Sequence, residues 1–164
     1  MLFRSDERAA AHHMDAARAL ADGWMTRAAD GDHTRLAFDR AGTWSLKYNL
    51  IWDRYFGFGL FPDDLFATEA SWYVAVTDVY GTPLDSRSNI GKADWISWVA
   101  CFDETSFERL IDPLWRMLHE SPSRVPFTDC HFTDTGRQRN FQNRSTVGAV
   151  WMRLLLDAVS AGAQ

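Results

Sequence analysis

Three aspartates lie in polar clusters whose composition suits acid–base chemistry on a small substrate. Four such clusters combine carboxylates or amides with cations and aromatic side chains, and they span residues 39–53, 83–95, 123–129 and 141–148. Asp85, Asp94 and Asp129 are the carboxylates of interest, because a carboxylate can transfer a proton or activate water. We predict that a general acid/base pair is drawn from these three.

Eight further side chains in the same clusters are candidates for substrate binding. They are Trp44, Lys47, Asn49, Trp52, Arg87, Trp95, Gln142 and Arg144. Cations hold a carboxylate, and arginine does so through a bidentate fork. Amide side chains orient an amide or hydroxyl group, and tryptophans exclude water from a site. The pattern therefore predicts a cleft for a small polar molecule.

The aspartates also have a structural interpretation. An aspartate before a helix is more often a cap than a catalyst, which applies to Asp94. Arginine–aspartate pairs more often stabilise a fold than catalyse a reaction. This applies to Asp85 with Arg87 and to an expected pair of Arg124 with Asp129. Both interpretations stay open on the sequence alone.

Other common catalytic and cofactor signatures are missing from the sequence. The five histidines show no metal-ligand spacing, and neither a glycine-rich phosphate loop nor a G-x-S-x-G serine motif occurs. Cys101 falls on an apolar helix face. Cys130 does not easily form a dyad with its neighbour His131, so neither thiol is expected to be a nucleophile. We predict no metal and no cofactor.

The composition is that of one globular domain. Its 164 residues match the usual size of a domain, and 46% apolar with 24% charged residues exclude a disordered chain. No apolar run is long enough to span a bilayer, and the N-terminal residues show no secretion signal. With a net charge of −5 and no basic face, nucleic-acid binding is not expected. Aromatic residues make up 14% of the chain, so some should line a cleft or an interface.

Apolar side chains at helical spacing predict six helices and no strand. The predicted helices span residues 8–25, 43–55, 62–76, 93–102, 105–118 and 146–161. Thr43 or Ser45 is expected to cap the second helix, and Thr105 is expected to begin a capping box in the fifth. Pro113 should bend that fifth helix, because proline removes one helical hydrogen bond. The predicted fold class is all-α.

The remaining segments divide into long loops and core stripes. Residues 78–92 and 119–144 read as loops, and loops of this length in a compact domain are usually functional or inserted. Trp98, Trp115 and Trp151 lie on helical stripes, where a tryptophan usually belongs to the core. These three tryptophans therefore receive no functional role.

Taken together, the motifs at the helix joints resemble one protein family. They are GTWSLKYNLIWD at 42–53, LFP at 60–62, YGTPLDSR at 80–87, KADW at 92–95, PSRVPFTD at 122–129 and FQNRSTVG at 141–148. In this order and spacing they are similar to the C-terminal part of the glutaminase A family, the fungal and bacterial L-glutaminases. In that family they fall in a six-helical-hairpin domain. The resemblance covers nearly the whole chain.

The resemblance implies a partial (α/α) toroid of the six-hairpin glycosidase type. Residues 1–164 would form a single domain of about three helical hairpins, like the C-terminal half of a larger toroid. In such toroids the cleft lies where the loops at the ends of the inner helices converge. The segments 78–92 and 119–144 are therefore expected to form its rim. The missing half of the toroid, or a homodimer, is the implied partner.

The resemblance also implies an activity and a location. The expected reaction is hydrolysis of the side-chain amide of L-glutamine to glutamate and ammonia, in an extracellular or periplasmic setting. One aspartate would activate water while a cation or amide stabilises the oxyanion. Two departures from the family pattern, Cys130-His131 after Asp129 and Ala149 after Gly148, fall near the expected cleft.

Two other functions stay open. The same toroid hosts glycosidases, which use two carboxylates, and tryptophans suit stacking against sugars. A non-catalytic helical scaffold is the other alternative, and it would expose an apolar face where further hairpins pack. Ammonia release from glutamine, oligosaccharide binding and self-association would distinguish the three functions.

Overall fold

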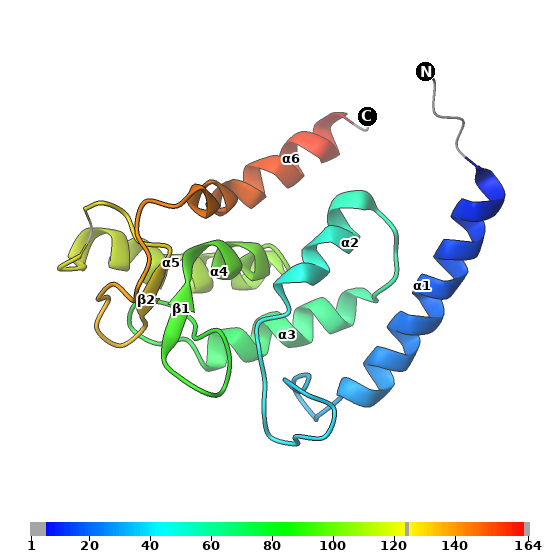
Figure 1. Ribbon diagram of the computed structural model, residues 1–164, viewed down its shortest axis with the longest axis horizontal. Coiled ribbons are helices and arrows are strands. Elements are labelled where there is room, and N and C mark those ends of the chain that lie inside the picture. The colour runs from blue at the N-terminus through cyan, green and yellow to red at the C-terminus, as the bar shows by residue number, and fades with distance from the viewer. Residues whose placement is uncertain (1–5, 124, 163–164) are drawn as a thin grey trace.

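Helices make up most of the chain in a computed structural model, which describes residues 6–123 and 125–162 (Figure 1). The helices are α1 (Glu7–Ala28), α2 (Ile51–Phe56), α3 (Asp63–Ala75), α4 (Ala93–Ala100), α5 (Glu104–Glu120) and α6 (Met152–Gly162). Short 3-10 helices, η1 (Tyr48–Leu50) and η2 (Ser145–Trp151), precede α2 and α6. The predicted all-α class is confirmed.

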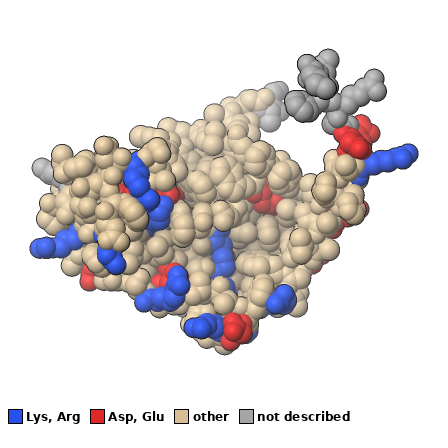
Figure 2. Space-filling model, viewed as in Figure 1, with Lys and Arg blue, Asp and Glu red and all other residues tan. Residues whose placement is uncertain are grey.

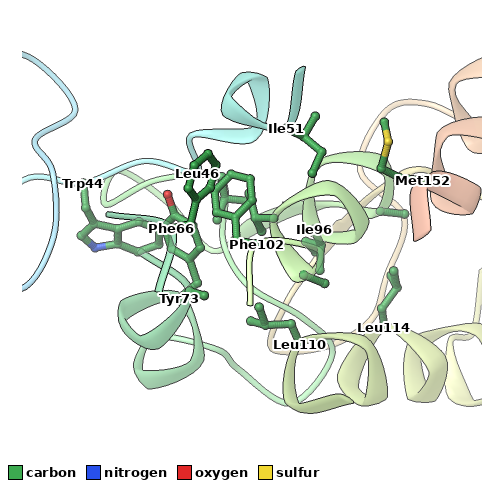
Figure 3. Close-up of a cluster of buried hydrophobic side chains, with 14 of the residues drawn as sticks. Trp44, Leu46, Ile51, Phe66, Tyr73, Ile96, Phe102, Leu110, Leu114 and Met152 are labelled. Atoms are coloured by element: carbon green, nitrogen blue, oxygen red, sulfur yellow. The ribbon is translucent and has the colours of Figure 1, made fainter. Parts of the chain in front are cut away.

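The hydrophobic core surrounds α4. This helix packs against α5, α6 and η2, and Ile96 at its centre is fully buried. Phe66 and Tyr73 of α3 meet Phe102 beyond the end of α4, and the Phe66 and Phe102 rings make an edge-on contact at 5.1 Å between centroids (Figure 3). Because α4 starts directly after Lys92, the core fixes the position of the polar residues at its N-terminus.

The two long loops pair with each other. Strand β1 (Ile90–Lys92) runs antiparallel to β2 (Cys130–Phe132), with Gly91 opposite His131. The N–H of Thr133 extends the contact by donating to the carbonyl of Asn89 at 2.8 Å. The sequence predicts no strand here, because three residues are too few to show an alternating pattern. The pairing places two of the predicted polar clusters side by side.

A buried histidine fixes the spacing of this strand pair. The Nε2 atom of His131 lies 2.8 Å from the carbonyl of Tyr80, so this nitrogen carries the hydrogen and donates it. A Cβ on Gly91 would lie 2.9 Å from a methyl group of Thr133 and 3.2 Å from the His131 ring, which is why only glycine fits there. Burial lowers the pKa of His131.

The second predicted helix begins later than expected. The segment around Ser45 is extended instead, because Ser45 forms a bridge with Asp85 and the N–H of Leu46 donates to the carbonyl of Leu84 at 2.8 Å. Neither Thr43 nor Ser45 caps a helix, and regular helix starts only at η1. The prediction for this segment is wrong because its partner strand lies about forty residues away in the chain, beyond the reach of a local pattern.

Helix α5 is capped by a different residue from the one predicted. Asp103, rather than Thr105, is the N-cap, and its carboxylate accepts the N–H of Ser106 at 3.0 Å. Aspartate is a strong capping residue, and the observed cap lies two residues before the predicted one. The helix continues through Pro113 to Glu120.

Two tryptophans predicted in the core are exposed. Trp115 of α5 and Trp151 of η2 are 61% and 64% exposed, and Leu154 of α6 is equally open. They border an apolar groove of about 480 Å³ between α5 and α6. The stripes are amphipathic as predicted, but no described segment covers this side of them. Trp98 is half-buried, and its indole N–H donates to the carbonyl of Ala149 at 3.0 Å.

Helix α1 stands apart from the other helices along one side of the molecule (Figure 1). Only Ala21 and Ala28 of α1 are buried, and Trp24 meets Phe61 edge-on at 5.7 Å. Figure 2 shows the surface hollowed between α1 and the rest of the molecule. Across the described residues, no helix combines the length and apolar character needed to cross a membrane.

Candidate functional site

Four side chains from different sequence clusters meet in the structure, and we call them the cation cluster. They are Lys92, Asp94, Asp129 and Arg144. The Lys92 ammonium donates to both carboxylate oxygens of Asp94 at 2.7 and 2.5 Å, and it lies 3.6 Å from Asp129. Arg144 donates to Asp129 through Nε at 3.1 Å and through a terminal guanidinium nitrogen. The pairing of β1 with β2, and the start of η2, thus assemble residues from three predicted clusters.

In the cation cluster the carboxylates lie inside and the cations face outward. The side chain of Asp129 is 0% exposed, whereas those of Lys92 and Arg144 are 15% and 34% exposed. Burial raises the pKa of Asp129, but hydrogen bonds from Arg144 and the charges of Arg144 and Lys92 lower it further, so it stays below its usual value. The two cations of the cluster are therefore more exposed than the carboxylates that hold them.

Aromatic rings flank these cations. The Lys92 ammonium lies 5.1 Å from the ring centroid of Trp95, and the Arg144 guanidinium lies 3.9 Å from that of Phe141. Tyr48 stacks on Trp95 with 3.7 Å between centroids and 18° between the ring planes. Such contacts favour a cation beside an aromatic face. Trp95 thus lies beside the cluster as predicted, and Tyr48 and Phe141 add to the wall.

Another polar cluster surrounds the other lysine of the chain. It consists of Thr34, Ser45, Lys47, Glu69 and Tyr73, and we call it the Lys47 cluster. Lys47 donates to the hydroxyl and the carbonyl of Ser45 at 2.8 and 3.1 Å and to the carbonyl of Thr34 at 3.4 Å. Glu69 of α3 is fully buried and accepts the N–H of Thr34 at 2.7 Å and the hydroxyl of Tyr73. Burial lowers the pKa of Lys47 to about 8, although nearby carboxylates oppose this shift.

Asp85 and Arg87 lie at the edge of the Lys47 cluster. Asp85 is the antiparallel bridge partner of Ser45, and it is buried. Its carboxylate accepts Nε and a terminal nitrogen of Arg87 at 2.9 and 2.7 Å. The hydrogen bond from Arg87 lowers the pKa of Asp85. Arg87 itself is 71% exposed, so its charge remains open to solvent or to a ligand.

The other predicted binding residues are scattered. Trp44 is buried in the core, edge-on to Trp72, so the prediction that it lines a cleft is wrong; the bridge at Ser45 turns its ring inward. Trp52 packs against Trp98 at 5.1 Å rather than against the cation cluster. Asn49 is exposed beside a pocket of about 260 Å³, and Gln142 is half-buried two residues before Arg144.

Some pairings and residues escape the sequence analysis. Arg124, the expected partner of Asp129, lies outside the described residues, and Arg144 makes the bidentate contact instead. Lys92 is the centre of the cation cluster although it is absent from the predicted site. The signal that could have found it is composition, because Lys47 and Lys92 are the only lysines and both fall within the motifs.

Neither thiol suits a nucleophile, and no metal centre is evident. Burial raises the pKa of Cys101 to about 11, and burial also raises that of Cys130. A raised pKa disfavours the reactive thiolate. In residues 6–123 and 125–162, no group of three His, Cys, Asp or Glu side chains is placed to bind a metal ion.

Comparison with known proteins places these clusters in a family. Residues 1–154 match the model of the glutaminase A six helical-hairpin domain. The chain belongs to this family. Glutaminase A of Aspergillus oryzae (strain ATCC 42149 / RIB 40) is 30% identical over 155 residues, which cover 90% of this chain and 22% of that protein. A probable glutaminase of Arthroderma benhamiae (strain ATCC MYA-4681 / CBS 112371) is 26% identical over 164 residues. This match covers 81% of this chain and 19% of that protein.

The chain spans about a fifth of the length of these two fungal relatives. No solved structure shows a significant match to the chain. The resemblance inferred from the motifs is confirmed at the level of the family. All four residues of the cation cluster and all residues of the Lys47 cluster lie within the matched region.

Proposed function

We propose that this domain supplies the substrate-carboxylate site of a glutaminase A-type hydrolase, which converts the side-chain amide of L-glutamine to glutamate and ammonia. One observation carries the proposal: Lys92 and Arg144 lie together, each held by a buried carboxylate, and the Arg144 side chain stays 34% exposed. Membership of the glutaminase A family and the printed names of the fungal relatives support the choice of substrate.

The geometry of the cation cluster suits the α-carboxylate of an amino acid. Arg144 can offer its guanidinium edge to a carboxylate, while Lys92 offers a point charge beside it. Both cations are held in place by Asp94 and Asp129, so little conformational entropy is lost when a substrate binds. The ring of Trp95 shields one side from water, which strengthens the ionic contact.

The acid–base role predicted for the aspartates stays a prediction. Asp85, Asp94 and Asp129 each accept a hydrogen bond from a cation. For Asp85 and Asp129 this arrangement favours the ionised carboxylate and lowers the pKa. It suits the anchoring of a cation better than the protonation of a leaving group.

A glycosidase is the second candidate, because Asp94 and Asp129 lie close together. The Lys92 ammonium, 2.5 Å from one carboxylate and 3.6 Å from the other, keeps the two within about 6 Å, near the spacing of retaining enzymes. A glycosidase, however, needs one carboxyl group with a raised pKa as general acid. The pKa of Asp129 is lowered and its side chain is sealed from solvent, so amide hydrolysis is favoured.

The test compares two substrates on the complete gene product. L-Glutamine carries an α-carboxylate, and 4-aminobutanamide carries a primary amide and an amine without one. We expect ammonia release from L-glutamine, and Arg144→Met should raise its KM about tenfold or more while leaving the analogue unaffected. Arg153→Gln, which changes an exposed arginine of α6, is the matched control.

Three outcomes would overturn the proposal. They are no ammonia release from L-glutamine, equal effects of Arg144→Met on both substrates, and hydrolysis of an oligosaccharide instead of glutamine. The extracellular or periplasmic location, and a partner that completes the toroid, stay predictions from the family resemblance.

A further inference from the structure

Ser45 and Lys47 have the geometry of a nucleophile with its base. They stand two residues apart in the chain, and their side chains meet on one side of the backbone. The Lys47 Nζ lies 2.8 Å from the Ser45 Oγ, within the range required for proton transfer between such groups. Ser45 is only half-buried, so its hydroxyl is not sealed in the core.

The backbone of this pair is held rigidly. Ser45 forms an antiparallel bridge with Asp85, and its carbonyl accepts the Tyr73 hydroxyl at 3.2 Å. The same tyrosine oxygen accepts the N–H of Lys47 at 2.9 Å, and its hydroxyl also contacts the buried carboxylate of Glu69. These contacts fix the backbone positions from which the Ser45 and Lys47 side chains extend.

The surroundings of Lys47 allow the amine to lose its proton. Its hydrogen-bond partners are three neutral oxygens, those of the Ser45 hydroxyl and carbonyl and of the Thr34 carbonyl. Burial lowers the pKa of Lys47 to about 8, against the charges of Glu69 and Asp85, which raise it. The neutral amine is therefore accessible near neutral pH, where a general base works best.

We propose that Ser45 is the nucleophile of an acyl-transfer site in this domain and that Lys47 is its general base. The proposal rests on the proposed function for its substrate class, a primary amide. The Ser45 oxygen attacks the amide carbon while its proton passes to the Lys47 amine. The tetrahedral intermediate collapses, the carbon–nitrogen bond breaks, and the proton leaves with ammonia. Water then hydrolyses the seryl ester, with Lys47 again taking and returning a proton.

A pocket lies beside Lys47. Its volume is about 260 Å³, and Lys47, Tyr48 and Asn49 contribute to its lining together with Trp24 of α1. It lies where the surface is hollowed between α1 and the rest of the molecule (Figure 2). Tyr48 stacks on Trp95, the ring beside the Lys92 ammonium. The pocket beside Lys47 and the Lys92 ammonium are thus connected through one aromatic stack.

The experiment uses a fluorophosphonate probe, which phosphonylates an activated serine and releases fluoride. The complete gene product is labelled across a range of pH, and the modified peptide is identified by mass spectrometry. We expect labelling at Ser45, with a rate that rises about tenfold per pH unit up to a pH of about 8. Ser45→Ala and Lys47→Arg should abolish it, whereas Ser71→Ala, at an exposed serine of α3, should not.

Kinetics separate this proposal from the proposed function. Ser45→Ala removes only the hydroxyl oxygen, whose hydrogen-bond partner is the Lys47 side chain. The substitution should lower kcat for L-glutamine by at least about 10³-fold. Glutaminase activity without labelling of Ser45, or with kcat unchanged in Ser45→Ala, would overturn the dyad and leave the proposed function standing. Labelling of Ser45 in a protein without glutaminase activity would support the dyad and overturn the proposed function. Neither labelling nor activity would overturn both.

Discussion

The two lysines of this chain lie in clusters with similar ingredients and opposite arrangements. In the cation cluster, the Lys92 ammonium touches a carboxylate directly, at 2.5 Å from Asp94. In the Lys47 cluster, the ammonium touches neutral oxygens, and the carboxylates of Glu69 and Asp85 act on it through space. The difference teaches that the two lysines are held in different ways, Lys92 by a carboxylate and Lys47 by neutral oxygens.

This difference separates binding from chemistry. A lysine fixed in place by a carboxylate can hold an anionic substrate. A lysine that is buried among neutral oxygens has a lowered pKa and can accept a proton. Both arginines pair with a buried aspartate and differ in exposure instead, since the Arg144 side chain is 34% exposed and that of Arg87 is 71% exposed.

The largest expected effect distinguishes the lysines directly. Lys47→Met should lower kcat for L-glutamine by about 10³-fold, because it removes the base. Lys92→Met should raise KM about tenfold, with a smaller change in kcat, because it removes a charged hydrogen bond to the substrate. Steady-state kinetics measure both, and equal losses of kcat in the two variants would erase the distinction.

The carboxylates should differ in their effect on stability. Asp129→Asn removes the partner of a buried ion pair and should lower the free energy of unfolding by about 3 kcal/mol. Asp85→Asn leaves an exposed arginine that water can solvate, so its cost should stay below about 1 kcal/mol. Urea denaturation measures both values. A larger loss in Asp85→Asn than in Asp129→Asn would contradict the ranking.

Acidification should destabilise the strand pair that supports the cation cluster. Burial lowers the pKa of His131 in the folded chain, so the unfolded chain takes up a proton first. The free energy of unfolding should therefore fall as the pH drops below about 6.5, by at most about 1.4 kcal/mol per pH unit, until the folded pKa is reached. Denaturation at several pH values tests this, and an unchanged slope in His131→Gln would refute it. Exposed His12→Gln serves as the control.

The smallest expected effect concerns Arg87. Its side chain is 71% exposed, so Arg87→Gln should change the free energy of unfolding by less than about 1 kcal/mol. The melting temperature is the measurement. A loss comparable to that of Asp129→Asn would mean that the Asp85–Arg87 pair is a structural anchor like the cation cluster.

Local patterns predicted the helices well and their partners poorly. The amphipathic stripes of α1, α3, α4 and α5 depend on neighbours within a few turns, so their spacing is visible in the sequence. The extended segment at Ser45 depends on a bridge to Asp85, forty residues later, and no local pattern records it. The helical stripes predict Trp115 and Trp151 in the core, but both are exposed. A stripe shows which face of a helix is apolar and does not show whether another segment covers that face.

The candidate site follows the same rule. Residue type alone picks out Asp94, Asp129 and Arg144 in the sequence. The pairing of β1 with β2 brings Asp94 and Asp129 together, and Arg144 pairs with Asp129. Which cation pairs with which carboxylate was not predictable, because that depends on how η2 returns over α4. Trp44 shares its polar neighbours with the site, yet its ring points into the core.

Binding of L-glutamate, the product of the proposed reaction, tests the role of the cation cluster most directly. Calorimetric titration of the complete gene product should show binding that weakens about tenfold or more in Arg144→Met and stays unchanged in Ser45→Ala. This result would establish that the cluster holds the carboxylate independently of the chemistry at Ser45. Equal affinity of the native protein and Arg144→Met for L-glutamate would contradict the account.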